Sequence, residues 1–367
     1  MTSLPGNPDT EVESGCRLFR MPAEWEPHRA TWLVWPHNRS DWEIKTRAAE
    51  NCFAEIGRTL VESECVAIVF HDEKIAKRAK QLLCSVSVDV AHIETVIART
   101  DRSWIRDSGP IFVSRKSGDD SREVAMTDWK FNGWARYRRW ENDNRIPGRL
   151  AAHLGCRRFP VLAEVTGGRR RTVLEGGSID VNGNGVLITT EECLLGKVQE
   201  RNPGMTRIDM ERTLGRYLGV NRVIWLGNGI VGDDTHGHVD NVARFVSRET
   251  VVAAYETDNT DANFQPLTEN LDCLRSVRTS NGRPLRVVQL PMPKPRYFEG
   301  QRLPASYTNF YVSNRAVLVP TFNEPADLEA LSILSELFPS RKIVGIYSGD
   351  LVIGGGAVHC ITQQEPV

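Results

Sequence analysis

One structural pattern recurs along the 367 residues: two short strands joined by a turn, then a helix, then a further apolar strand. One of the turns carries Asn182-Gly183, and an Asn-Gly step is a strong signal for a two-residue hairpin. The predicted strand pairs are residues 109–113 with 123–126, 178–181 with 186–189, 242–246 with 251–254, and 309–312 with 317–319. A pattern that returns along the chain in this way indicates a fold built from repeats.

Helical patterns lie between these strand pairs, at residues 48–61, 210–218, 270–277 and 327–338. Each is followed by a β-branched run, at 66–70, 222–226, 285–290 and 342–347, and we expect the stretch before Cys360 to supply the last member. Because one such unit cannot bury its apolar face alone, repeated units usually close on themselves. The alternative is a doubly wound α/β sheet, but hairpins between the helices argue against all-parallel pairing. We therefore predict one closed, propeller-like α/β ring of about five units, in which the hairpin starts converge near an axis.

Composition restricts the function classes. Forty per cent hydrophobic and 25% charged residues are typical of a soluble globular protein, and a net charge of −1 argues against nucleic acid as a partner. The eight cysteines form no Cys-x-x-Cys pair, and no apolar run is long enough to cross a membrane. Without a secretory signal, we expect a reduced, cytoplasmic protein with a disordered lead over residues 1–18 and a single catalytic domain over 19–367.

A cysteine follows a glycine run close to the end of the chain, in residues 354–360. The glycines allow close approach of backbone or ligand, and a thiolate is a strong nucleophile that needs no metal. A buried structural cysteine is the alternative interpretation of Cys360. The polar motifs described next, which lie earlier in the chain, favour a nucleophilic role for Cys360.

Two acidic motifs precede predicted hairpins. Asp107 follows Trp104 by three residues, and a carboxylate beside an indole suits a cation with an apolar stem. Glu175 stands before paired glycines, where it would act as a general base or orient a histidine. The structural alternative for Asp107 is a turn cap or a pair with Arg106, and for Glu175 it is a surface turn.

The third motif, residues 232–241, contains two histidines and three acids. If Val239 lies on a strand, His238 and Asp240 share one face by the period of two. Either His236, His238 and Asp240 ligate a divalent metal, or His238 exchanges protons with Cys360 while Asp240 holds a cationic substrate. The cysteine and the lack of a third histidine ligand favour the second interpretation.

Together these motifs resemble the agmatine deiminase family, which belongs with the bacterial, Porphyromonas-type peptidylarginine deiminases in the guanidine-modifying pentein superfamily. The matching stretches are Trp-x-x-Asp with Gly-Pro, Leu-Glu-Gly-Gly-Ser, Gly-Asp-Asp-Thr-x-Gly-His-Val-Asp, Ala-Ser-Tyr-x-Asn-Phe and Gly-Gly-Gly-x-Val-His-Cys-x-Thr-Gln-Gln. The resemblance covers residues 21–367 in the same order. It implies a five-bladed α/β propeller (pentein fold) of repeated ββαβ units, in agreement with the repeat.

The resemblance also implies roles for single residues and a substrate. The implied assignments are Cys360 as nucleophile, His238 as general acid and base, Glu175 as the acid beside it, Asp107 and Asp240 as guanidinium-binding carboxylates, Trp104 as the wall along the methylene chain, and Asp234 as the acid nearest the distal amine. The implied substrate is agmatine, with no metal and no cofactor. A peptidylarginine or free-arginine deiminase, an amidinotransferase and a metal-dependent amidohydrolase are the alternatives, and a homodimer stays open.

Three departures from the family pattern concern the distal end of the substrate. Asp180 stands where a histidine is common, Ala135-Arg136 replaces a common Gly-Gly, and the segment 295–302 is shorter than in many members. The clustered Arg136, Arg138 and Arg139 are either solvated loop charge or a carboxylate-binding group.

Overall fold

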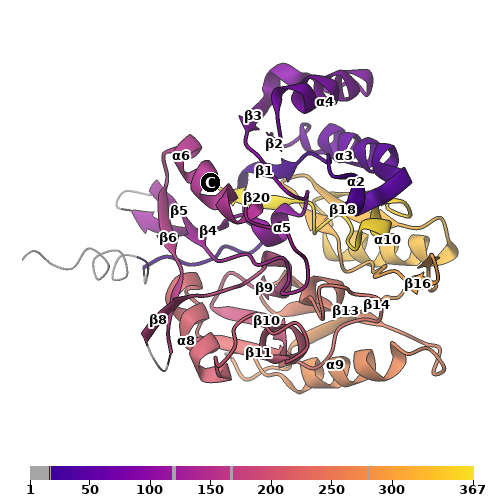
Figure 1. Ribbon diagram of the computed structural model, residues 1–367. Coiled ribbons are helices and arrows are strands. Elements are labelled where there is room, and N and C mark those ends of the chain that lie inside the picture. Colours follow the sequence, from indigo (N-terminus) through magenta and orange to yellow (C-terminus); the bar gives the residue numbers. More distant parts are fainter. Residues whose placement is uncertain (1–15, 17, 118–120, 166–167, 280) are drawn as a thin grey trace, which may run out of the picture.

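Sheets with one shared strand order make up the fold (Figure 1). The computed structural model describes residue 16 and residues 18–117, 121–165, 168–279 and 281–367, so the predicted lead over residues 1–18 falls almost wholly outside the described residues. In each three-stranded sheet a central strand pairs antiparallel with a hairpin partner and parallel with the strand that follows a helix.

Four of these sheets are three-stranded and follow the chain directly. They are β4 (Ile111–Ser117), β5 (Ser121–Asp128) and β6 (Arg157–Pro160); β9 (Ile179–Val181), β10 (Val186–Thr190) and β11 (Arg222–Leu226); β12 (Ala243–Ser247), β13 (Thr250–Tyr255) and β14 (Arg286–Pro291); and β17 (Tyr311–Val312), β18 (Ala316–Thr321) and β19 (Lys342–Tyr347). The hairpins β7 (Leu162–Val165) with β8 (Gly168–Arg171) and β15 (Tyr297–Phe298) with β16 (Gln301–Arg302) stand outside this order.

The fifth sheet joins the two ends of the chain. Its order is β20 (Gln363–Pro366), β1 (His28–Val34), β2 (Cys65–Phe70) and β3 (Ile93–Ile97), with β20 antiparallel and β2 parallel to β1. Figure 1 shows the yellow C-terminal strand beside the indigo N-terminal one. This pairing closes the ring, and the predicted α/β fold of five ββαβ units is confirmed.

Helices cover the outside of the ring (Figure 1). The helices that lead to the parallel strand of each sheet are α3 (Thr46–Leu60), α6 (Ile146–Leu154), α8 (Arg207–Leu218), α9 (Phe264–Ser276) and α10 (Pro325–Leu337), and α4 (Glu73–Ser85) leads to β3. Helix α9 contacts β11 of the preceding sheet, α10 contacts β14, and α3 contacts β19. Each of these three helices therefore packs against two neighbouring units. No helix in the described ranges is long and apolar enough to cross a membrane.

Helix α8 illustrates how the sequence sets these elements. Thr206 caps its first turn in a capping box with Asp209, and Gly219 ends it with φ +68°, a conformation that favours glycine. Met210 and Leu214, spaced by one helical turn, are buried on the inner face. Residues next to the helix therefore set the ends of α8, whereas packing against the neighbouring strands buries its inner face.

Three sequence expectations need correction. Helix α9 begins at Phe264, earlier than predicted, and α6 with β6 was not predicted because Pro147-Gly148 opens the helix and exposed arginines begin the strand. Residues before Cys360 form a short 3-10 helix (Leu351–Gly354), and the strand that completes the last unit, β20, comes after the cysteine.

Candidate active site

Short helical turns precede the hairpins, and they bring polar side chains to the centre of the ring. Asp107 lies on α5 (Ile105–Ser108), and Glu175 caps η4 (Gly176–Ser178). His238 caps η5 (Val239–Asn241), so Val239 does not lie on a strand. The period-two argument for His238 and Asp240 was wrong, and the 3-10 turn brings both to the site instead. Turns α5 and η5 both contact η4.

Cys360 is buried beside an amide and a carboxylate. Its Sγ accepts a hydrogen bond from Asn309 Nδ2 at 3.1 Å and donates one to Asp240 Oδ2 at 3.6 Å. Burial raises the pKa of the Cys360 thiol well above its usual value, and the Asp240 and Asp107 carboxylates act in the same direction. A cation at this place would reverse the effect of the carboxylates and favour the thiolate.

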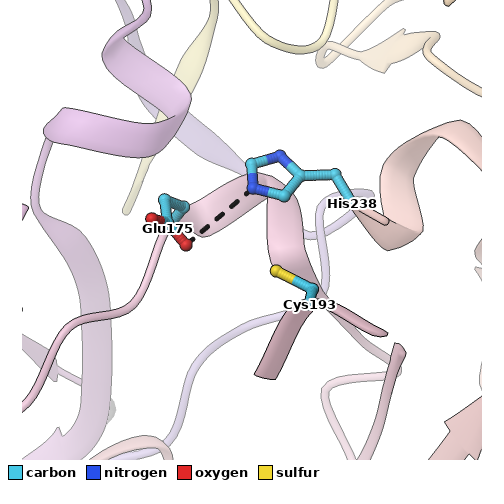
Figure 2. A group of neighbouring side chains, drawn as sticks. All are labelled: Glu175, Cys193 and His238. Atoms are coloured by element: carbon cyan, nitrogen blue, oxygen red, sulfur yellow. Dashed lines mark ion pairs between the residues drawn. The ribbon is translucent and has the colours of Figure 1, made fainter. Parts of the chain in front are cut away.

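The imidazole of His238 lies between two carboxylates. Its Nδ1 is 3.7 Å from Asp107 Oδ1 and its Nε2 is 3.9 Å from Glu175 Oε2 (Figure 2). Burial works to lower the pKa of His238, but the Asp107 carboxylate, the Cys193 side chain and the Glu175 carboxylate hold it well above its usual value. The imidazole is therefore held in the protonated form, as a general acid requires.

Gly177 keeps the space in front of this histidine open. A Cβ added at residue 177 would lie 2.7 Å from His238 Nδ1, 2.8 Å from Asp107 Oδ1 and 2.9 Å from Asp240 Oδ2. Nδ1 and the two carboxylates therefore surround one point, while Nε2 faces Glu175.

Arg201, which the sequence analysis missed, sets the charge of Glu175. Both side chains are fully buried, and Arg201 Nε donates to Glu175 Oε1 at 3.2 Å. Although burial favours the neutral acid, the Arg201 and His238 charges lower the pKa of Glu175 to about 2. Glu175 is thus a carboxylate at neutral pH.

The two guanidinium-binding candidates have different surroundings. Asp107 accepts hydrogen bonds from Trp134 Nε1 at 3.0 Å and from the Gly177 amide at 3.1 Å, and burial raises its pKa to about 7. Asp240 Oδ2 is 2.8 Å from His359 Nδ1. Burial opposes ionisation of Asp240, but His359 lowers its pKa below the usual value.

Trp104 and Asp234 line a narrow pocket of about 10 Å³ together with Asp107, Trp134 and Cys360. Asp234 accepts a hydrogen bond from the Tyr137 hydroxyl at 2.5 Å. A Cβ at residue 356 would lie 2.8 Å from the Trp104 ring and 2.9 Å from Cys360 Cβ, so the glycine run allows the indole to approach the thiol.

The alternative metal site of His236, His238 and Asp240 does not assemble. His236 has φ +64° and its Nδ1 pairs with Glu192 Oε1 at 2.9 Å. Within the described part of the chain, the one group of three side chains with the spacing of a metal site is Glu175, Cys193 and His238.

The signals for the missed residues differ. Asn309 belongs to a motif quoted above, and His359 is adjacent to the cysteine, so the sequence could have identified both. Trp134 and Arg201 belong to loops with no pattern of their own. Asp180, which departs from the family pattern, pairs with the buried Arg244 at 2.8 Å.

The ring of ββαβ units, with a cysteine, a histidine and carboxylates at its centre, places the chain in the guanidine-modifying pentein class. The sequence model of the Porphyromonas-type peptidyl-arginine deiminase family matches residues 20–366, and the chain belongs to that family. The resemblance stated from the motifs is confirmed.

Two relatives from distant organisms are both agmatine deiminases. The chain is 36% identical to the agmatine deiminase of Pseudomonas aeruginosa (strain UCBPP-PA14) over 374 residues, 95% of each chain. It is also 36% identical to that of Medicago truncatula over 378 residues, 95% of this chain and 96% of the other.

Solved structures give the same picture. The agmatine deiminase of Enterococcus faecalis superposes with a TM-score of 0.84 at 29% identity, covering 100% of this chain and 99% of that one. The C. jejuni agmatine deiminase has a TM-score of 0.79 at 27% identity, covering 95% and 96%.

Proposed function

We propose that the protein is an agmatine deiminase, which hydrolyses the guanidinium of agmatine to N-carbamoylputrescine and ammonia through a cysteine-linked thiouronium intermediate. The observation that carries the proposal is the convergence of His238 and the carboxylates of Asp107 and Asp240 on one buried point, with the Cys360 thiol hydrogen-bonded to Asp240. The names of the relatives support agmatine as the substrate.

Substrate binding supplies the charge that the site lacks. A guanidinium keeps its proton at neutral pH, so the substrate arrives as a cation. Asp107 and Asp240 grip its nitrogen edges and orient the carbon toward Cys360. The cation offsets both carboxylates, and the pKa of the thiol falls on binding.

The reaction then has two halves. Cys360 releases its thiol proton to solvent as the substrate binds, and the thiolate attacks the guanidinium carbon. His238 transfers a proton to the departing nitrogen, which leaves as ammonia. In the second half His238 takes a proton from water, whose oxygen adds to the thiouronium carbon. The carbon–sulfur bond breaks, and the ureido product leaves with the thiol restored.

Glu175 and Arg201 act on His238 from the Nε2 side of its imidazole. The carboxylate faces Nε2 and stabilises the imidazolium, which leaves Nδ1 toward the reacting atoms. Arg201 keeps Glu175 ionised. Both are positioning residues for the proton transfer.

The acids around the pocket favour agmatine over arginine. Asp234 lines the pocket and suits a distal ammonium, whereas the α-carboxylate of arginine would face a like charge. Arg102 also lines the pocket, but its guanidinium pairs with Asp41. The exposed Arg136, Arg138 and Arg139 would favour a carboxylate end, but they do not line the pocket.

Ammonia release from agmatine, free arginine and C-terminal arginyl peptides, measured side by side, tests the substrate. We expect kcat/KM for agmatine to exceed that for arginine by about 10²-fold or more. Equal rates, or faster reaction of peptides, would replace agmatine with an arginyl substrate.

The cysteine chemistry has separate tests. Cys360→Ala must abolish turnover, and transfer of the amidino group to an added amine in preference to water would identify an amidinotransferase. Light scattering tests the homodimer, and fractionation tests the cytoplasmic location.

A further inference from the structure

A second cysteine, Cys193, lies beside His238 and Glu175. Glu175, Cys193 and His238 are all buried, and their ligand atoms lie within 4.8 Å of one another (Figure 2). Cys193 belongs to the short helix α7 (Glu191–Leu195), whose cap, Thr190, accepts a hydrogen bond from the Cys193 amide at 3.1 Å. The mechanism above does not use this thiol.

Two of the three ligand atoms have no other partner. Glu175 Oε2 and His238 Nε2 make no hydrogen bond among the described residues, although both side chains are fully buried. Their separation of 3.9 Å is too long for a hydrogen bond. Buried polar atoms left in this way carry a free-energy cost, which a shared ligand would remove.

The donor set suits a thiophilic divalent cation. Sulfur, imidazole nitrogen and carboxylate oxygen are the ligands of Zn²⁺, and their bonds of about 2.0–2.3 Å place tetrahedral ligand atoms roughly 3.3–3.8 Å apart. An oxygen–nitrogen pair lies at the short end of that range, so the 3.9 Å between Glu175 and His238 must contract by roughly 0.5–0.6 Å on binding.

The surroundings fit the same assignment. Arg201 occupies Glu175 Oε1 and leaves Oε2 for the cation. The opposite ring nitrogen of His238 lies 3.7 Å from Asp107 Oδ1, which is beyond hydrogen-bond distance but on the side where a carboxylate commonly orients a metal-bound imidazole.

We propose that Glu175, Cys193 and His238 form an inhibitory site for a thiophilic divalent cation such as Zn²⁺. Binding displaces the proton of the Cys193 thiol and leaves His238 with a proton on Nδ1 alone. The imidazole can then no longer cycle between imidazolium and neutral ring, so proton transfer stops. Metal binding itself does not depend on the proposed function, but the inhibition does.

The position of the site predicts the type of inhibition. The cation lies on Nε2, whereas Asp107 and Asp240 surround the Nδ1 side. Guanidinium binding therefore persists, and we expect Zn²⁺ to lower kcat with little change in KM. A cation bound to Cys360 would instead compete with the substrate.

Direct binding is tested with Co²⁺, because a thiolate ligand gives a charge-transfer band in the near ultraviolet. The band is expected in Cys360→Ala and lost in Cys360→Ala/Cys193→Ala. Cys360→Ala/Cys52→Ala is the control, since Cys52 is a buried helical cysteine outside the cluster. A band that survives removal of Cys193 would overturn the proposal. This measurement of metal binding is valid even if agmatine is not the substrate.

Inhibition is measured after preincubation with Zn²⁺, because the site is buried. Cys193→Ala, and Cys193→Ser as a second variant with near-native volume, should keep basal turnover. Each should need at least about 10-fold more Zn²⁺ for half-inhibition, since even outer-shell losses weaken metal binding 10–100-fold. A chelator should restore the native enzyme. Competitive inhibition that is unchanged in both variants would assign the metal to Cys360 and refute the site.

Discussion

Replacing Gly177 by alanine tests the geometry of the centre with a single methyl group. Gly177 lies in the 3-10 turn η4 and does not need a left-handed backbone, so alanine fits the main chain. The methyl would lie 2.7–2.9 Å from His238 Nδ1, Asp107 Oδ1 and Asp240 Oδ2. To restore ordinary contact at 3.4 Å, each of these groups must move by about 0.5–0.7 Å.

Displacements of this size are large for catalysis. A misplacement of about 1 Å in a reacting group costs about 10²-fold in rate, and here three groups move together. We expect kcat/KM for agmatine to fall by at least about 10²-fold, which corresponds to ~2.7 kcal/mol of lost transition-state stabilisation. The overpacking should lower stability by only about 1–3 kcal/mol, so the variant stays folded.

The matched control is Gly227→Ala. A Cβ at residue 227 would meet only Asn270 Oδ1, at an ordinary 3.7 Å, and the Gly227 amide keeps its hydrogen bond to the same oxygen. Its kcat/KM should remain within about twofold of the native value, as for a surface change without strain. For both variants, ammonia release gives kcat/KM and a thermal melt shows whether the protein stays folded. A Gly177→Ala enzyme within threefold of native kcat/KM would refute the convergence of these side chains on one point.

The remaining predictions use the charges of the site. Asp107 has its pKa raised to about 7, so native stability falls as pH rises from about 4 to 7; Asp107→Asn should abolish turnover yet melt higher than the native protein at pH 8 and not at pH 4. Arg201→Met should cost ~3–5 kcal/mol in denaturant unfolding because it leaves Glu175 unpaired, and adding Glu175→Gln should recover most of it. Asn309→Ala removes a donor to Cys360, so alkylation by iodoacetamide at fixed pH should slow; unchanged alkylation would contradict this contact.

The fold was predictable because short sequence patterns, such as hairpin turns and helix caps, mark the elements of each repeat. Hairpin turns and helix caps set the bounds of β9 with β10 and of α8, and their order along the chain implied a ring. The closing strand β20 was assigned to the wrong side of Cys360, because residues 363–366 are polar in sequence although they are buried. Their burial comes from β1, which is far away in the chain.

The candidate site was predictable to the extent that its residues stand in motifs. Cys360, His238 and Asp107 follow recognisable patterns, and the structure brings them together. Arg201 and Trp134 lie in loops, and only the packing of one unit on another gives them a partner. No local pattern in the sequence encodes such a contact.

The buried carboxylates of the centre are neutralised in different ways. Glu175 has a permanent cation in Arg201, and its pKa is about 2. Asp240 has His359, whose other nitrogen is 2.8 Å from Glu24, and the pKa of Asp240 is lowered. Both carboxylates are therefore stabilised by a neighbouring side chain before any substrate arrives.

Asp107 is the exception. Its other partners are the neutral N–H groups of Trp134 and Gly177, and its nearest cation is His238, the group that must give up its proton during turnover. A guanidinium that enters takes over the neutralisation of Asp107 and so frees His238 to act as the acid. The same charge lowers the pKa of Cys360. The positive charge of the substrate therefore completes the catalytic group, and a neutral analogue of equal shape would bind to a site whose thiol stays protonated.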